Sequence, residues 1–132
     1  MDLKFQYAHN SHDESETRAN VRSEEALQAF DTFDWQGESE KASKIQKCSP
    51  TLSVIGDKGH LIWLSSVAYG DTVQFVSECN FPGEVSSWFG LSKKQGIVNL
   101  DADWFSLTQA RAALELYLKN NYDQLKSHYK GL

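Results

Sequence analysis

The sequence contains no apolar run that approaches the roughly 20 residues needed to span a bilayer. Its first residues, MDLKFQYAHN, also lack the basic segment and the apolar segment of a secretory signal peptide. We therefore expect a cytoplasmic protein that has no membrane partner.

Cysteine is scarce, with Cys48 and Cys79 as the only two. In a reducing compartment, two cysteines favour free or buried thiols over a disulfide. A structural zinc site uses four ligands, commonly in close pairs, and the sequence does not supply them. The segment His9-x-x-His12-Asp13 has neither a helix to place its side chains nor a third strong ligand, so a polar loop is favoured over a metal site.

The sequence motifs of the common enzyme classes are missing as well. There is no G-x-S-x-G elbow, and neither cysteine lies near a histidine along the chain. The H-x-E and P-C-x-x-C elements of zinc deaminases are absent, and GLSKKQG (residues 90–96) lacks the ending of a phosphate loop. Asp101-x-Asp103 could pair as acid and base or hold a cation, although a solvated pair is the simpler interpretation. We expect no enzyme, no metal and no cofactor.

Basic charge is in deficit, and the deficit is uneven. The net charge is −5; residues 1–40 carry ten acids against three bases, whereas the other 92 residues carry eight acids against ten bases. Nucleic-acid binders show the opposite, a basic patch or stripe, so we expect no nucleic-acid partner. An acidic region suits a basic protein partner, although charge alone is also explained by a solvated acidic surface.

What is present suffices for one folded domain. The chain has 132 residues, of which 40% are hydrophobic and 23% charged, as in ordinary globular proteins. A chain of this length buries roughly two-thirds of its unfolded surface. We expect a single domain over residues 1–132.

Residues 49–80 contain the strongest structural signal. Apolar residues alternate around Leu52 and Val54, resume in HLIWL (residues 60–64) and return at Val73, separated by Gly- and Asp-containing turns. This pattern predicts an antiparallel meander. Because HLIWL is apolar at successive positions, it predicts a central strand with both faces covered.

The preceding residues predict a strand, a loop, a helix and a connection. Residues 2–8 alternate as a half-buried edge strand, and residues 9–20 are polar throughout, as in a loop. Ser23 is a suitable N-cap for a helix over residues 24–33, which would pack Leu27, Phe30 and Phe33 on the sheet. Trp35 would end this helix, and residues 37–47 would form a polar connection.

The residues after the meander predict a turn over 81–84, a fourth strand over 85–91 and a hairpin turn over 92–96. A strand over 97–105 would turn Val98, Leu100, Ala102 and Trp104 to its apolar face. Ser106 would cap a second helix, with Leu107, Ala110, Leu114 and Tyr117 on one stripe. Residues 122–132 fit either a further helical turn or a closing strand.

Strands gathered between helices are typical of an α+β fold. We expect a single antiparallel sheet of about five to six strands, with one helix from the N-terminal half and one C-terminal helix packed on one face. The other face would be available for binding.

From residue 49 onward the chain resembles the immunity proteins of bacterial polymorphic toxin systems, and in particular the immunity family often encoded beside deaminase-type toxins. That family has a Pro-x-Leu strand, a Gly-containing turn, an apolar strand, a Phe-x-Ser strand and a Ser-Leu-x-x-Ala-x-x-Ala helix with a Phe/Tyr-Leu end. The matching residues here are Pro50-Thr51-Leu52, residues 56–59, residues 61–64, Phe75-Val76-Ser77, and residues 106–113 followed by Tyr117-Leu118. The resemblance covers roughly residues 21–120.

This resemblance implies a small, non-catalytic cytoplasmic protein that covers the active site of a cognate toxin domain. Toxins that act on nucleic acid are basic where their substrate binds, so carboxylates could occupy that cleft. We expect a protein that is a monomer when free. The partner-binding residues that we expect are Asp13, Glu14, Glu16, Glu38 and Glu40, with Tyr69 or Trp88 as an aromatic anchor.

Two other functions remain open from the sequence. A secretion chaperone is also small, acidic and α+β, and it would bind an extended effector segment, usually as a dimer. A small hydrolase or ligand-binding domain would use Asp101 and Asp103 beside a deep pocket.

Overall fold

The computed structural model describes residues 1–11, 14–46, 49–56, 58–86 and 93–130, with the backbone alone for residues 85–86 and 93–94. Six strands form one sheet in the order β2-β1-β3-β4-β5-β6, and every neighbouring pair is antiparallel. The strands are β1 Asp2–Gln6, β2 Glu16–Arg18, β3 Thr51–Ile55, β4 Leu61–Tyr69, β5 Thr72–Ser86 and β6 Lys93–Phe105.

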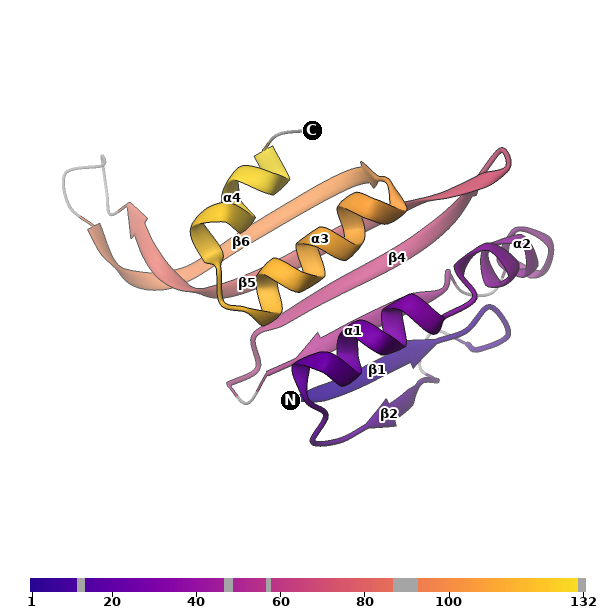
Figure 1. The fold of residues 1–132 in the computed structure, drawn as a ribbon, viewed down its shortest axis with the longest axis horizontal. Coiled ribbons are helices and arrows are strands. Elements are labelled where there is room, and N and C mark those ends of the chain that lie inside the picture. The colour runs from indigo at the N-terminus through magenta and orange to yellow at the C-terminus, as the bar shows by residue number, and fades with distance from the viewer. Residues whose placement is uncertain (12–13, 47–48, 57, 87–92, 131–132) are drawn as a thin grey trace.

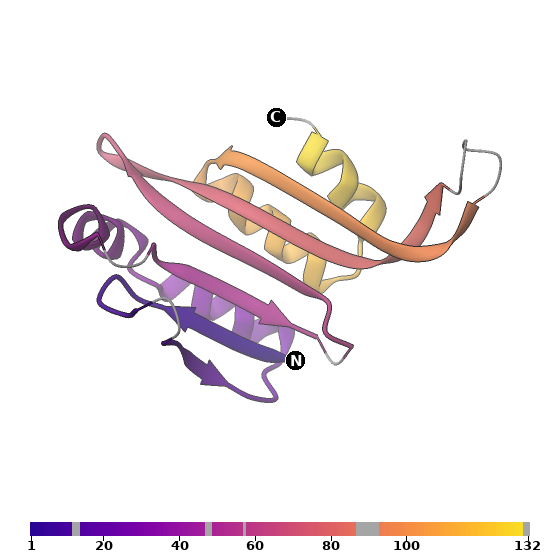
Figure 2. The same ribbon diagram turned by 180° about the vertical axis from the view of Figure 1, so that it is seen from behind.

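The helices are α1 Ser23–Thr32, α2 Trp35–Ile45, α3 Leu107–Leu118 and α4 Tyr122–Lys130. Helices α1, α3 and α4 lie on one face of the sheet (Figure 1), and the view from behind shows the opposite face without a helix (Figure 2). We call these the helix-covered face and the open face. The arrangement confirms the predicted α+β fold. None of the helices in the described part of the chain is long and apolar enough to cross a membrane.

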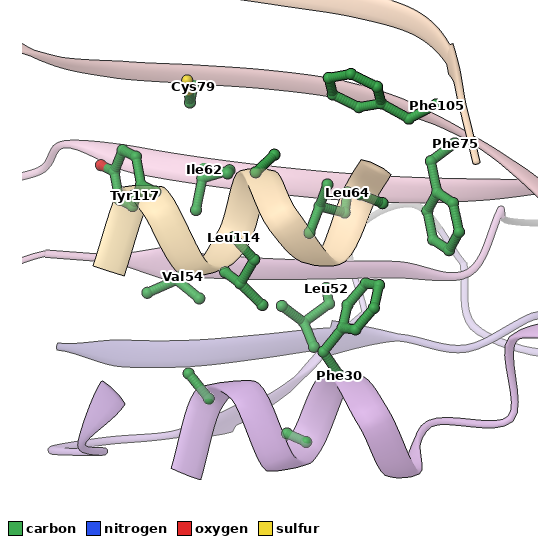
Figure 3. Packing of buried hydrophobic residues seen from close by; sticks show 14 of the residues in the cluster. Phe30, Leu52, Val54, Ile62, Leu64, Phe75, Cys79, Phe105, Leu114 and Tyr117 are labelled. Carbon is green, nitrogen blue, oxygen red and sulfur yellow. The ribbon is translucent and has the colours of Figure 1, made fainter. Parts of the chain in front are cut away.

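The hydrophobic core lies between the helix-covered face and the helices. Alternate residues of the inner strands, such as Leu52, Ile62 and Phe75, are fully buried, and Phe30 of α1 and Leu114 of α3 point toward them from the helices (Figure 3). Burial of such side chains is worth about 1.5–3 kcal/mol each. This packing fixes which face of every strand remains outside.

Local capping sets the starts of α1 and α3. The Ser106 hydroxyl accepts from the Gln109 amide at 3.1 Å, and the Gln109 side chain accepts from the Ser106 amide at 2.8 Å. This reciprocal capping box confirms the predicted helix start. Helix α1 begins one residue earlier than predicted, because Arg22 rather than Ser23 is its N-cap, with the Glu25 carboxylate accepting from the Arg22 amide at 3.3 Å.

The predicted connection over residues 37–47 is wrong, because most of this segment is helix α2. Asp34 caps the helix by accepting from the Gly37 amide at 3.1 Å, and Trp35, expected to end the previous helix, is the buried anchor of this one. Besides Trp35, the buried positions of α2 are Glu38 and Ser39. Since its inward face is mostly polar, the helix has no apolar stripe for the sequence to reveal.

The polar loop predicted for residues 9–20 contains the short strand β2. It pairs with β1, so that Phe5 lies opposite Glu16, and all three of its residues are exposed. An edge strand held by backbone hydrogen bonds needs no buried side chain. Hydrophobic alternation therefore could not predict it.

The predicted turn over residues 81–84 is also wrong, because β5 runs through it without a break. Strand β4 pairs with β5 only as far as Cys79, so beyond Cys79 the only strand of the described residues that pairs with β5 is β6. Pro82 is tolerated because a missing N–H is harmless on the side of a strand that has no partner. Gly83 is required by close packing, since an added Cβ would lie 2.9 Å from a methyl group of Val98.

Strand β6 differs from the prediction at both ends. Residues 93–96, expected in a hairpin turn, already belong to the strand, and the fourth strand expected over 85–91 falls partly in β5 and partly outside the described residues. A bulge places the four residues from Ala102 to Phe105 against the three from Phe75 to Ser77. As a result Phe105 is buried, whereas Trp104, expected on the apolar face, is 59% exposed.

Strand β4 is internal, as predicted, but it is covered on one face alone. Ile62 and Leu64 are buried, whereas Leu61 and Trp63 are only partly buried on the open face. The tail that the sequence left undecided forms helix α4, which places Leu125 and Tyr129 in the core.

Candidate functional site

The open face is a broad surface of the sheet that no described helix covers (Figure 2). Strand pairing places one row of side chains across it: Lys4, Ser53, Trp63, Glu78 and Asp101, each directly opposite the next. The row runs from a cation on β1 through a partly buried indole on β4 to two carboxylates on β5 and β6. Its polarity therefore changes from one edge of the sheet to the other.

Apolar side chains lie along the same face. Ile55, Leu61, Val67 and Val76 are partly buried, and Tyr69, Ile97 and Trp104 are 58%, 48% and 59% exposed. Large exposed apolar groups gathered on one face are typical of protein interaction sites. The apolar residues of the helix-covered face are explained by packing in the core. The apolar residues of the open face do not pack in that core, so their presence has another cause.

Tyr69 and Trp104 form the aromatic end of the open face. Tyr69 ends β4 and Trp104 lies in the β6 bulge, and their ring centroids are 6.5 Å apart. Trp104 has φ 66°, a left-handed conformation that is rare and strained for a bulky residue. This backbone conformation directs the indole outside the core, where the side chain is 59% exposed.

Glu78, Asp101 and Asp103 form the acidic end; together we call them the acidic triad. All three are exposed, and none of the three carboxylates has a hydrogen-bond or ion-pair partner within the described residues. Glu78 lies directly opposite Asp101. Like charges in this position weaken strand pairing, so the arrangement does not serve stability.

Two shallow hollows mark this face. One, of about 400 Å³, is lined by Lys4, Gln6, Ser15, Ser53, Ile55, Leu61 and Trp63. The other, of about 230 Å³, lies at the acidic triad and is lined by Glu78, Asp101 and their strand neighbours, among them Asn80 and Asn99. In the described part of the chain, no group of three or more His, Cys, Asp or Glu side chains could hold a metal ion.

Two of the predicted carboxylates, Glu14 and Glu16, lie near the β1–β2 edge. Glu14 accepts from the amide and the hydroxyl of Ser11, at 3.0 Å and 2.7 Å. Glu16 accepts from the Tyr7 hydroxyl at 3.1 Å, on the helix-covered side of β2. Partial burial and the neighbouring Glu16 carboxylate raise the pKa of Tyr7. Both carboxylates are exposed and accessible.

Glu38 and Glu40 lie on α2 rather than on a connection, and their environments differ. Glu38 is buried: one carboxylate oxygen accepts from the Ala8 amide at 3.0 Å and the other from Lys41 at 3.1 Å. Glu40 is exposed and accepts from Gln36 at 3.0 Å. Glu38 therefore holds the end of β1 to α2, and little of it is available to a partner.

The structure does not collect the predicted residues into one surface. Tyr69 belongs to the open face, whereas Glu16 and Glu38 belong to the helix-covered side, and Asp13 and Trp88 lie outside the described residues. Glu78 was not among the residues predicted from the sequence. Alternation along β5 would have placed it outside the core, but only the strand register places it against Asp101.

The one described cysteine, Cys79, is a free buried thiol on the helix-covered face. Burial raises its pKa to about 11, partly opposed by a hydrogen bond with Tyr129. A thiol with so high a pKa is a poor nucleophile at neutral pH. Cys79 is therefore part of the core rather than of a reactive site.

Comparisons of this chain with protein-family models, with curated proteins and with solved structures give no match.

Proposed function

We propose that this chain is a non-catalytic immunity protein that binds a cognate toxin domain and covers its active site. The family resemblance names nucleic-acid-targeting deaminases as the class of toxin. On this proposal the protein is a monomer until it meets the toxin, and it needs neither metal nor cofactor to act.

The observation that carries the proposal is the open face itself. It combines exposed aromatic residues, Tyr69 and Trp104, with the acidic triad, whose carboxylates have no partner among the described residues. Aromatic residues are enriched where proteins bind one another, and unpaired surface charge steers a partner of opposite sign. A toxin that binds nucleic acid presents a basic cleft of that sign.

A hydrolase that uses Asp101 and Asp103 is a weaker alternative. Both side chains are exposed, and the hollow beside Asp101 is only about 230 Å³. Substrate pockets commonly enclose most of a ligand in a volume of about 300–1,000 Å³. The surface suits contact with a protein better than enclosure of a small molecule.

The decisive experiment is co-purification of the tagged protein with the product of the gene immediately upstream. We expect a one-to-one complex of nanomolar affinity, and we expect the neighbouring protein to be toxic when it is expressed alone. A neighbour that neither binds nor kills would contradict the proposal. Replacing Glu78, Asp101 and Asp103 with lysine should slow association with the toxin, whereas Glu24→Lys on the other side of the molecule should not.

A secretion chaperone is the second candidate, because a broad uncovered sheet face also suits an extended effector segment. Light scattering of the isolated protein separates the two functions. A stable homodimer favours the chaperone, and a monomer favours the immunity protein.

A further inference from the structure

Strand β6 forms one edge of the sheet, and it is far longer than the opposite edge. It extends from Lys93 to Phe105, whereas β2 at the other edge spans Glu16–Arg18. No described strand pairs with β6 on its outer side, where it forms the rim of the sheet in Figures 1 and 2. In an antiparallel edge strand every second residue directs its N–H and C=O outward. Natural proteins usually shorten or cover such edges.

The side chains of β6 are incompletely covered on the helix-covered face. Val98 and Leu100 are only partly buried, whereas Phe81 and Cys79, their partners on β5, are fully buried. An additional strand beside β6 would therefore find uncovered apolar side chains on this face.

The other side of β6 is polar and acidic. Asn99, Asp101 and Asp103 alternate with the apolar residues and are exposed. The bulge at Asp103 and Trp104 ends the regular ladder, since Trp104 has φ 66°. The usable edge is therefore the regular segment of residues 97–102.

We propose that the regular segment of β6 receives an extended segment of the toxin as a seventh strand. This inference rests on the proposed function and names how the partner binds. In this kind of binding, main-chain hydrogen bonds between the two strands provide the affinity, and the alternate side chains of the added strand provide the specificity. The fitting segment alternates apolar residues, which pack beside Val98 and Leu100, with lysine or arginine residues, which face Asp101 and are attracted by Asp103 at the end of the regular segment.

A second copy of this chain fits the edge less well. Antiparallel pairing of two copies over residues 97–102 places Asp101 opposite Ile97 or Asn99, neither of which is charged. In either pairing no positive charge lies opposite the carboxylates, and one carboxylate lies against the aliphatic side chain of Ile97. Charge complementarity favours the basic segment.

The first experiment uses synthetic peptides on the isotope-labelled full chain. The probe is an acetylated, amidated peptide in which valine and lysine alternate, and the control has the same composition with all valines before all lysines. We expect the alternating peptide to bind more tightly, by about tenfold or more, and to slow amide exchange at alternate residues of 97–102. Methylation of the peptide nitrogens should abolish both effects. Equal binding of the two peptides, protection elsewhere in the chain, or self-association through β6 would overturn the inference.

A charge exchange tests the proposed side-chain pairing. The double variant Asp101→Lys, Asp103→Lys should no longer bind the valine–lysine peptide and should instead bind a peptide in which valine and glutamate alternate. The matched variant Glu24→Lys on α1 should bind as the unaltered protein does. If the double variant folds with unchanged circular dichroism but keeps its original preference, the pairing is wrong.

Hydrogen exchange in the toxin complex separates this inference from the proposed function. If the upstream gene product binds and β6 becomes protected, both are supported. If it binds while residues 97–102 exchange as fast as in the free protein, the added strand is refuted and the immunity function is not. If no toxin binds, the function fails, whatever the peptides show.

Discussion

Glu78 and Asp101 lie directly opposite one another on β5 and β6, both exposed on the open face. Directly opposed like charges destabilise a strand pair. Neither carboxylate has an ion-pair partner within the described residues. On the proposed function, we expect a lysine or arginine of the toxin to lie near both carboxylates in the complex and to relieve this repulsion.

Replacing Glu78 with glutamine should therefore stabilise the free protein and weaken toxin binding. We expect the free energy of unfolding to rise by about 0.2–1 kcal/mol because one of two like charges is removed. Urea unfolding measures the gain, which should shrink at high salt as the repulsion is screened. Asp71→Asn, in the turn between β4 and β5, is the matched control and should change neither quantity. A loss of stability in Glu78→Gln would show that the carboxylates do not repel.

Trp104→Gly should have opposite effects on folding and on binding. Glycine adopts the φ of 66° without strain, so the variant should keep or gain stability despite losing its indole. If the ring is a binding anchor, toxin affinity should fall by about 2 kcal/mol, as for other aromatic anchors. Calorimetry measures both quantities. Leu107→Ala, which removes a 46% exposed side chain on the helix-covered side, should leave the affinity unchanged.

Glu38 and Glu40 should behave differently although they lie two positions apart on α2. Glu38→Ala leaves the buried Ala8 amide without its acceptor, which should destabilise the protein by about 1–3 kcal/mol. Glu38→Gln keeps an acceptor and should be milder. Glu40→Ala should stay within about 0.5 kcal/mol, as exposed substitutions usually do. Equal losses in Glu38→Ala and Glu40→Ala in urea unfolding would contradict the structural role of Glu38.

The protein should lose stability in alkaline solution, in part through Cys79. Burial raises the pKa of this thiol from 9.0 to about 11, so between these values the unfolded chain releases its proton before the folded one does. The thiol contribution is intact below pH 9.0 and is lost as the pH rises to about 11, by up to about 3 kcal/mol. Burial raises the pKa values of Tyr117 and Tyr129 as well, so they add a loss at higher pH.

The difference between the unaltered protein and Cys79→Ala isolates the thiol. Urea unfolding of both proteins at neutral pH and near pH 10 should give a smaller alkaline loss for the variant. Identical alkaline losses would show that Cys79 ionises as readily in the folded protein as in the unfolded chain.

Residues whose structure is decided by near neighbours were predictable. The capping box of Ser106 and Gln109 lies within one helical turn, and the alternation of Leu52 and Val54 reflects one buried face. The α+β fold follows from the order of such elements. Helix α2 was not predictable, because its inward residues Glu38 and Ser39 are satisfied by Ala8 and Ser66, which are distant in the sequence.

The candidate site was only partly visible in the sequence for the same reason. Tyr69 and the Asp101-x-Asp103 pair could be selected by residue type. Their setting depends on strand register, which brings Glu78 to Asp101 and, through the bulge, turns Trp104 out to Tyr69.

The sequence by itself determined the local features of this protein: which residues alternate in a strand, which residues cap a helix, and how much acidic charge the chain carries. Only the tertiary structure decided that β5 continues through Pro82 and that three carboxylates lie together on the open face. The physical reason is that alternation and capping are interactions over a few residues, whereas strand register is set by contacts between residues far apart in the chain.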